Sequence, residues 1–359
     1  MYNFADIRSV HLELTTHCNA KCPMCARTQE GGVTNKLLPL TELSLEQIKQ
    51  IFPKEFVNQL WEVYLCGNYG DPLVAKQTLE IFEYFKSCNT GLRTKMHTNG
   101  SARSQDWWAR LAKVCDEVYF GIDGLKDTNP LYRIGTSFDK IIENAKAYIA
   151  SGGYAKWQFI VFRHNEHQVE EARLLAAQYG FKEFNIKKTG RFFSNTKLEV
   201  KQEKPIYNSE GVETHRLQMP EQTKFQNKAL GQEQELIERY GSMKSYLDST
   251  QIKCQSVDTR SIYVTAEGLV FPCCWLANQM YVWYQKPREG EVWKYIDRLP
   301  EKENGISALR YSIKEILEGP FFTQHIPEAW NLPTIASGKS WVCSKTCGKD
   351  FNQFKQQFR

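Results

Sequence analysis

The amino-acid sequence predicts an α/β fold in which short strands alternate with amphipathic helices. Two observations predict it: apolar runs of strand type recur through the first half of the chain, and segments with helical spacing separate them. The 359 residues, 42% of them hydrophobic, suffice for a sizeable core. This length allows two domains, or one large α/β domain with an appendage.

Six segments have the pattern of strands. Residues 10–15 alternate apolar and polar side chains with period two, as a half-buried strand does. The complete set of predicted strands comprises residues 10–15, 61–66, 92–97, 117–122, 157–162 and 184–188.

Four segments between these strands have helical spacing. The first follows Ser44, which with Gln47 forms the pattern of a capping box, and the last ends at Gly180. The predicted helices comprise residues 45–52, 79–85, 138–149 and 169–179. Strands and helices in this order predict a parallel sheet or barrel of right-handed βα units, with functional residues at the C-terminal ends of the strands.

The chain divides into three predicted regions. Residues 1–190 hold the alternating strands and helices. Residues 191–250 are polar, look helical only over 233–247, and are expected to form a linker or a substrate-facing insert. Residues 251–359 are expected to form a small cysteine-rich domain.

Composition excludes several classes of protein. No apolar run reaches the length of a membrane helix, and the N-terminus lacks a signal-peptide pattern, so we expect a cytoplasmic protein. The 46 basic and 41 acidic residues are interspersed, which does not favour nucleic-acid binding. Eleven cysteines, an odd number, in a reducing compartment indicate metal ligation rather than disulfides.

The strongest motif is Cys18, Cys22 and Cys25, which directly follow the first predicted strand. Cysteine thiolates at this spacing can hold an iron-sulfur cluster, and three ligands for four irons leave one iron open. A zinc loop is the alternative, but His17 is the only further zinc ligand that the loop offers.

This cysteine spacing resembles that of the radical SAM superfamily. The resemblance implies a partial (β/α)6 TIM-like barrel, a 4Fe-4S cluster on Cys18, Cys22 and Cys25, and S-adenosylmethionine (SAM) chelating the open iron. Met24 stands where the family often has an aromatic residue, and a methionine there can pack softly near the adenine.

Two turns in the first half also resemble the family's SAM-binding segments. Gly67, Gly70 and Asp71 resemble the Gly-Gly-Glu-Pro segment that binds the methionyl amino group, but Asn68 and Tyr69 displace the second glycine and aspartate replaces the glutamate. Thr98 and Asn99 resemble the turn beside the ribose. Outside this context both segments would be ordinary turns.

Three further polar residues follow the fourth and fifth predicted strands. Asp123 and Arg133 resemble a pattern of the peptide-modifying branch, in which the arginine would hold a carboxylate of SAM or substrate. Asn165 resembles an asparagine near the adenosyl group. A surface arginine and a helix N-cap are the alternative interpretations of Arg133 and Asn165.

A second cysteine set lies in the last third of the chain. Four thiolates complete either a tetrahedral zinc site or a fully ligated iron-sulfur cluster. The Cys-Gly-Cys order, with thirteen and then four intervening residues, resembles the SPASM and twitch domains of radical SAM enzymes and implies one auxiliary 4Fe-4S cluster. The expected ligands are Cys254, Cys273, Cys343 and Cys347. Cys274 is the alternative to Cys273 as a ligand, because adjacent side chains in an extended segment point in opposite directions. Cys66, Cys88 and Cys115 are expected in the core.

The resemblance implies an enzyme that reductively cleaves SAM at the cluster to a 5′-deoxyadenosyl radical. The radical would abstract a substrate hydrogen, and the auxiliary cluster would accept the electron that oxidises the substrate. Expected partners are a small molecule or peptide and a flavodoxin- or ferredoxin-type electron donor. Only 17 residues precede Cys18, too few for the N-terminal peptide-recognition domain of many peptide maturases, which favours a small or non-leader substrate or recognition by a separate partner. The alternatives are a non-catalytic iron-sulfur electron carrier, a zinc-stabilised binding protein and an RNA-modifying radical SAM enzyme.

Overall fold

The computed structural model describes residues 2–194 and 198–352, and an eight-stranded sheet runs through it. The strand order is β12-β11-β1-β2-β3-β4-β5-β6. These strands are β1 (Ser9–Leu12), β2 (Glu62–Leu65), β3 (Arg93–Thr98), β4 (Glu117–Gly121), β5 (Tyr154–Ile160), β6 (Glu183–Lys187), β11 (Ser261–Val264) and β12 (Val270–Phe271).

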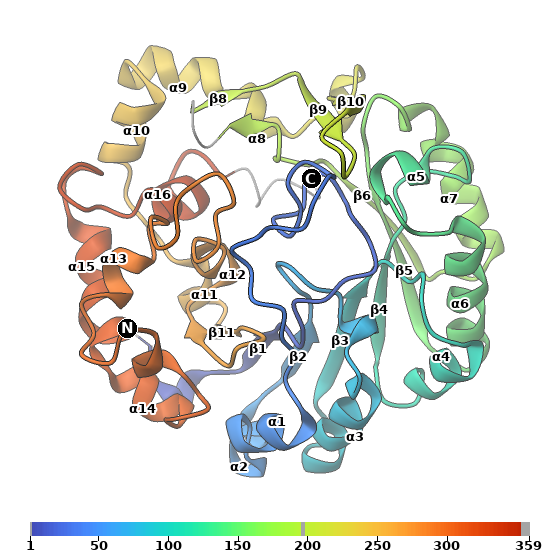
Figure 1. The fold of residues 1–359 in the computed structure, drawn as a ribbon, viewed down its shortest axis with the longest axis horizontal. Helices are drawn as coiled ribbons and strands as arrows, with labels where there is room; N and C mark the ends of the chain where they lie inside the picture. The colour runs from blue at the N-terminus through green and yellow to red at the C-terminus, as the bar shows by residue number, and fades with distance from the viewer. Residues whose placement is uncertain (1, 195–197, 353–359) are drawn as a thin grey trace.

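All six strands predicted from the sequence are present. β1 to β6 pair in parallel and in chain order, as in the register that places Leu12 opposite Leu65. β1 is shorter than predicted because Thr15 bridges to Glu42 and so leaves the ladder. The sheet curves around the centre of the molecule with helices on its outer side, which confirms the partial barrel (Figure 1).

The helices of the barrel follow the predicted order. They are α1 (Leu45–Ile51), α2 (Lys54–Gln59), α3 (Thr78–Cys88), α4 (Gln105–Leu111), α5 (Asn129–Tyr132), α6 (Phe138–Ala150) and α7 (Val169–Gln178). The capping box of α1 is confirmed, since Gln47 N donates to Ser44 Oγ at 3.2 Å and Ser44 N donates to Gln47 Oε1 at 2.9 Å. The helices that the pattern missed, α2, α4 and α5, have at most seven residues and present too few apolar positions to show a period.

Helix over 233–247 is confirmed in the insert, as two helices rather than one, but the pattern missed the short helix Lys228–Gly231 and the strands of the insert. An antiparallel hairpin, β9 (Glu203–Tyr207) and β10 (Glu213–Gln218), occupies this insert. The predicted helix is split by Gly241, which adopts a φ of 82° that ends a helix readily. The other elements of the insert are β7 (Phe193–Ser194), β8 (Glu199–Val200), α8 (Lys228–Gly231), α9 (Glu233–Tyr240) and α10 (Met243–Ser249).

The C-terminal region extends the barrel sheet. β11 pairs in parallel with β1 and places Ile262 opposite Val10, and β12 continues the sheet antiparallel to β11. Phe271 and Phe321 belong to the same apolar core as the barrel strands. β11 thus covers the edge that β1 would otherwise expose. The helices of this region are α11 (Gln255–Asp258), α12 (Cys274–Ala277), α13 (Trp293–Ile296), α14 (Ile313–Glu318), α15 (Ile326–Asn331) and α16 (Trp341–Cys347).

The interior face of the barrel sheet is polar. Toward the N-terminal ends of the strands, Glu117 accepts hydrogen bonds from Tyr119 and Arg93 and pairs with Lys156 at 3.0 Å. One layer further along, ring pairs such as His97 and Tyr119 stack with centroids 4.2 Å apart. In a complete TIM barrel, layers of apolar side chains fill the centre. The two layers named here, within the part of the chain that the structure describes, consist of charged and aromatic side chains instead.

The Glu117 network predicts a pH-dependent contribution to stability. Burial alone would raise the pKa of Glu117, but hydrogen bonds from Lys156, Arg93 and Tyr119 lower it to about 2. The contribution is therefore present above the ordinary carboxyl pKa, near 4.5, and is lost as the pH falls toward 2. We expect urea unfolding to show wild type more stable than E117Q at pH 6, with the difference at least halved at pH 3. A constant difference would contradict the prediction.

Candidate functional site

Cys18, Cys22 and Cys25 lie on the loop that leaves β1 at the C-terminal edge of the barrel. Backbone hydrogen bonds hold this loop, because Cys25 N donates to Cys22 O at 3.0 Å and Thr28 Oγ1 donates to the same oxygen at 2.8 Å. Burial raises the pKa of Cys18, and the charges of Asp71 and Cys22 add to this effect. Negative charge on these sulfurs therefore needs a positive partner such as a metal cluster.

Hydrogen-bond donors approach two of the three sulfurs. Asn99 Nδ2 lies 3.8 Å from Cys18 Sγ, and Arg133 Nη1 lies 3.7 Å from Cys22 Sγ. Within the described chain, no three His, Cys, Asp or Glu side chains converge as the ligands of one metal ion do. Three thiolates on one loop can each bind one iron of a cluster.

Glu13 is a site residue that the sequence analysis missed. Its Oε1 accepts hydrogen bonds from Tyr69 N at 2.7 Å and Gly70 N at 2.9 Å, and its Oε2 accepts from the Tyr263 hydroxyl. Burial raises the pKa of Glu13 to about 7 despite these hydrogen bonds. One signal could have found it: Glu13 continues the inward-facing alternation of Ser9 and His11 at the end of a predicted strand.

The two glycines of the Gly67 to Gly70 segment lie where a Cβ would not fit. A Cβ on Gly70 would lie 1.7 Å from Thr15 O, and one on Gly67 would lie 2.7 Å from Glu13 Oε1. Both glycines are thus required by close backbone approach. The segment lies beside Cys25, whose Sγ is 3.7 Å from Asn68 O.

Asp71 binds the turn predicted to lie beside the ribose. It accepts from Thr98 Oγ1 at 2.8 Å, from Asn99 N at 2.7 Å, from Asn99 Nδ2 at 2.8 Å and from Leu73 N at 2.9 Å. A carboxylate has about four lone-pair positions, so these donors occupy them all. The structure therefore brings Asp71, Thr98 and Asn99 together beside Cys18.

Asp123 and Arg133 form a buried ion pair at the end of β4. Arg133 Nε donates to Asp123 Oδ2 at 2.6 Å, and the guanidinium also reaches Cys22. A Cβ on Gly121 would lie 2.3 Å from Arg133 Nη2, so only glycine leaves room for this arginine. Asn165 is fully buried and donates to Asp123 O and Ile160 O, both at 3.0 Å.

Two more basic residues lie at the same edge. Arg191 Nη1 donates to Met24 O at 2.9 Å and thereby joins the insert to the cysteine loop. Lys187 ends β6, and burial, together with the positive charge of Arg191, lowers its pKa to about 8. The sequence analysis assigned neither residue a role, although Lys187 lies in the last predicted strand of the barrel.

The structure also brings together the four cysteines of the second set. Burial raises the pKa of Cys273, and the neighbouring charges of Cys274, Cys343 and Cys254 add to it. Cys347 lies on α16 with Cys343, and its carbonyl oxygen accepts from Lys253 N at 3.0 Å, next to Cys254. The hydroxyl of the partly buried Tyr2 lies 3.6 Å from Cys254 Sγ.

The side chain of Cys274 lies near barrel residues, whereas that of Cys273 lies near the other cysteines of the second set. Burial, followed by the charges of Cys66 and Glu13, raises the pKa of Cys274 to about 12. Gly268 adopts a φ of 78° between β11 and β12, where a Cβ would lie 2.9 Å from Leu309 Cγ. The glycine of the Cys-Gly-Cys order thus forms a turn that other residues would strain.

Comparison with known proteins identifies the first half of the chain. Residues 12–176 match the radical SAM superfamily. The mycofactocin maturase MftC of Mycobacterium ulcerans (strain Agy99) is 31% identical over 172 residues, which cover 47% of this chain and 44% of MftC. MftC of Mycolicibacterium smegmatis is 31% identical over 173 residues, covering 47% of this chain and 41% of MftC. The chain thus matches less than half the length of these relatives.

Solved structures share the fold over nearly the whole chain. Native anSMEcpe with bound AdoMet has a TM-score of 0.54 and 16% identity, covering 96% of this chain and 93% of anSMEcpe. Streptococcus suis SuiB bound to the precursor peptide SuiA has a TM-score of 0.51 and 14% identity, covering 94% of this chain and 77% of SuiB. Among the described residues, none of the helices has the length and apolar character needed to cross a bilayer.

The environment of Glu13 predicts different effects for two substitutions. Glu13→Ala leaves the Tyr69 and Gly70 amides without their acceptor, and we expect it to lower the free energy of unfolding by about 2–5 kcal/mol. E13Q keeps an acceptor oxygen, so urea unfolding should show a smaller loss. Equal losses in the two variants would contradict the role of Glu13 as an acceptor.

A pH series separates the charge of Glu13 from its hydrogen bonds. Because the folded-state pKa, about 7, lies above the ordinary value of 4.5, the protonated form contributes stability that is lost as the pH rises through 7. The wild type should therefore lose stability relative to E13Q between pH 6 and pH 8.

Proposed function

We propose that the chain, whose residues 12–176 match the radical SAM superfamily, cleaves SAM reductively and uses the 5′-deoxyadenosyl radical to abstract a hydrogen atom from a peptide. The observation that carries this proposal is the loop after β1, where Cys18, Cys22 and Cys25 lie together within reach of Asn99 and Arg133. When bound, a 4Fe-4S cluster supplies the electron and the open iron for SAM.

The protein's own residues position this chemistry. Asn99 and Arg133 donate toward the sulfurs of Cys18 and Cys22, which stabilises their negative charge. Asp71 already accepts four hydrogen bonds, so we assign it to holding the Thr98–Asn99 turn rather than to the amino group of SAM. The backbone of the Gly67 to Gly70 segment, which Glu13 fixes, is then the part free to meet that ammonium group.

Other predicted positions take supporting roles in this proposal. Met24 borders the adenine side of the cysteine loop, where Arg191 holds its carbonyl oxygen. Asn165 keeps Asp123 in place through the backbone, and Asp123 in turn orients Arg133. A carboxylate of SAM or substrate would then meet the remaining face of the Arg133 guanidinium.

The second cysteine set would hold an auxiliary 4Fe-4S cluster. Cys254, Cys273, Cys343 and Cys347 lie close enough together to supply four thiolates. Four ligands leave no open iron, which suits electron transfer and therefore an oxidation of the substrate. A flavodoxin- or ferredoxin-type protein would deliver the electron for SAM cleavage.

A peptide substrate is supported by the relatives. MftC is a maturase, and SuiB and anSMEcpe with the fold of this chain have been solved with a bound precursor peptide and a Cp18Cys peptide, respectively. The basic residues Lys187 and Arg191 at the barrel edge suit a substrate that carries an acidic group near the reacting carbon.

Replacement of the three loop cysteines tests the assignment of the first cluster. After anaerobic reconstitution, we expect about eight irons per wild-type chain and about four in the Cys18/Cys22/Cys25→Ala variant. The variant should also lose SAM cleavage, measured as 5′-deoxyadenosine formed with dithionite. Wild-type protein with no such cleavage would support the non-catalytic electron carrier.

Cys343→Ala tests the second cluster separately. We expect the variant to lose about half of the iron and to retain uncoupled SAM cleavage while losing the peptide product. One zinc per chain in the wild type, and loss of both activities in soluble Cys343→Ala protein, would instead indicate a structural zinc site.

A further inference from the structure

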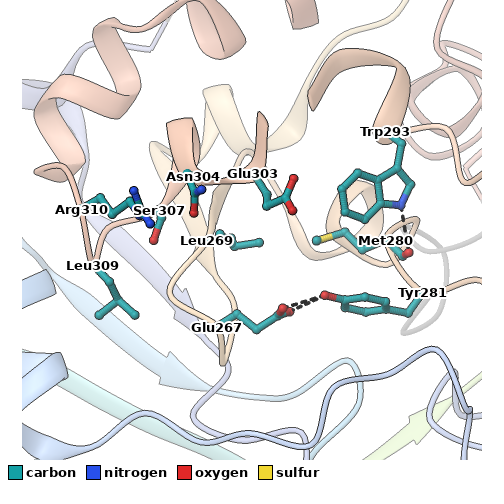
Figure 2. A pocket seen from close by; sticks show the side chains of 10 residues that line it. All are labelled: Glu267, Leu269, Met280, Tyr281, Trp293, Glu303, Asn304, Ser307, Leu309 and Arg310. Carbon is teal, nitrogen blue, oxygen red and sulfur yellow. Dashed lines mark hydrogen bonds between the residues drawn. The ribbon is translucent and has the colours of Figure 1, made fainter. Parts of the chain in front are cut away.

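A cavity of about 430 Å³ lies beside the candidate site and is not part of it. One end and the floor are mainly apolar, and three short segments of the C-terminal region supply its polar groups. The lining residues are Glu267, Leu269, Met280, Tyr281, Trp293, Glu303, Asn304, Ser307, Leu309 and Arg310. Figure 2 shows Met280 and Trp293 at one end, Leu309 and Arg310 at the other, and Leu269 between them.

One wall of the cavity is shared with the candidate site. The Tyr281 ring packs edge-on against the Tyr69 ring with centroids 5.9 Å apart, and Tyr69 N is held by Glu13. Asn35, on the segment that follows the cysteine loop, donates to Tyr281 O at 2.7 Å. A molecule bound in the cavity would therefore lie one aromatic layer away from the Gly67 to Gly70 segment.

Glu267 gives the cavity a carboxylate that forms no ion pair with the described residues. Both of its carboxylate oxygens accept from the Tyr281 hydroxyl, at 2.7 and 2.8 Å (Figure 2), and it forms no salt bridge with any residue that the structure describes. Glu303, by contrast, pairs with Arg288 at 3.4 Å. A half-buried carboxylate without a cation is costly, and an entering cation would remove that cost.

The aromatic end of the cavity also suits a cation with an apolar stem. Trp293 already takes a cation on one face, since the guanidinium carbon of Arg288 lies 3.9 Å from its ring centroid. Met280 and Leu269 provide apolar surface along which methylene groups can lie. At the opposite end Asn304, Ser307 and Arg310 offer hydrogen-bond donors for the carbonyl oxygens of a peptide.

We infer that this cavity binds a basic side chain, lysine or arginine, of the peptide substrate, with its charge on Glu267 and its stem along Met280 and Leu269. The inference rests on the proposed peptide substrate. It makes the cavity a specificity site for the residue next to the reacting segment, separate from the residues that hold the cluster and SAM.

The test uses three capped amino acids on the reconstituted full-length protein. The probes are Nα-acetyl methylamides of L-lysine, L-norleucine, which has a similar stem without the charge, and L-glutamate. Ligand-observed NMR at pH 8 should show the lysine probe binding at least about fivefold more tightly than norleucine. Equal binding of the lysine and norleucine probes, or preference for the glutamate probe through Arg310, would overturn the inference.

Three variants connect binding with the cavity. E267Q should remove the preference for lysine, and Leu309→Lys, which places an ammonium on the cavity wall, should abolish it by a different route. E301Q is the matched control, because Glu301 also accepts a tyrosine hydroxyl, that of Tyr311 at 2.6 Å, but lies outside the cavity. The inference fails if E301Q weakens lysine binding as much as E267Q does, or if neither E267Q nor Leu309→Lys weakens it.

A pH series and an activity control complete the design. Burial, with the charge of Glu303, raises the pKa of Glu267 although the Tyr281 hydrogen bond opposes it, so lysine binding should strengthen with rising pH. The pKa values of Arg288 and Tyr281 are raised, so both remain protonated over pH 6–8. Glu303 and Arg310 are the other charged groups that line this cavity. SAM cleavage is measured on the same preparations: intact cleavage without selective lysine binding rejects only the cavity inference, and absent wild-type cleavage rejects the proposed function.

Discussion

One buried carboxylate, that of Glu13, joins the parts of the molecule that form the site. Glu13 follows the last residue of β1. Its carboxylate accepts hydrogen bonds from two backbone amides of the segment after β2 and from the hydroxyl of Tyr263 on β11. The two neighbours of β1 in the sheet are thus tied together just beyond their strands. Because Cys18 follows only five residues later, the position of the cysteine loop depends on the same group.

The polar interior of the barrel follows from the same alternation that builds the sheet. The barrel strands turn apolar side chains toward the outer helices and a polar or aromatic side chain inward, as Val118 and Tyr119 do on β4. With six parallel strands the barrel stays open, and the inward residues can be satisfied by one another, as Glu117 is by Lys156. The energy of folding therefore comes mainly from the outer layer, which leaves the inner edge available for charged groups such as Arg133.

The sequence was sufficient where a local pattern has a single structural meaning. The six barrel strands, the α1 capping box and the three-cysteine loop were predicted because alternation, cap chemistry and ligand spacing are all local. The pairing of β11 with β1 could not be predicted, since a four-residue segment does not specify its partner. The sequence also could not predict that the Asp71 carboxylate accepts four hydrogen bonds, because these bonds depend on the approach of a turn that begins 27 residues later.

The departure of the Gly67 to Gly70 segment from the family pattern has a structural counterpart. Where the second glycine is expected, Asn68 donates from its side chain to Cys274 O at 2.7 Å, while its own carbonyl oxygen lies 3.7 Å from Cys25 Sγ. Cys274 is bonded to Cys273 in the second cysteine set. Asn68 and Cys274 therefore connect Cys25 with Cys273 through two close contacts. A glycine at position 68 could not make the contact to Cys274, because that contact comes from the asparagine side chain. The insertion that weakens the motif in the sequence is thus what joins the barrel site to the C-terminal region.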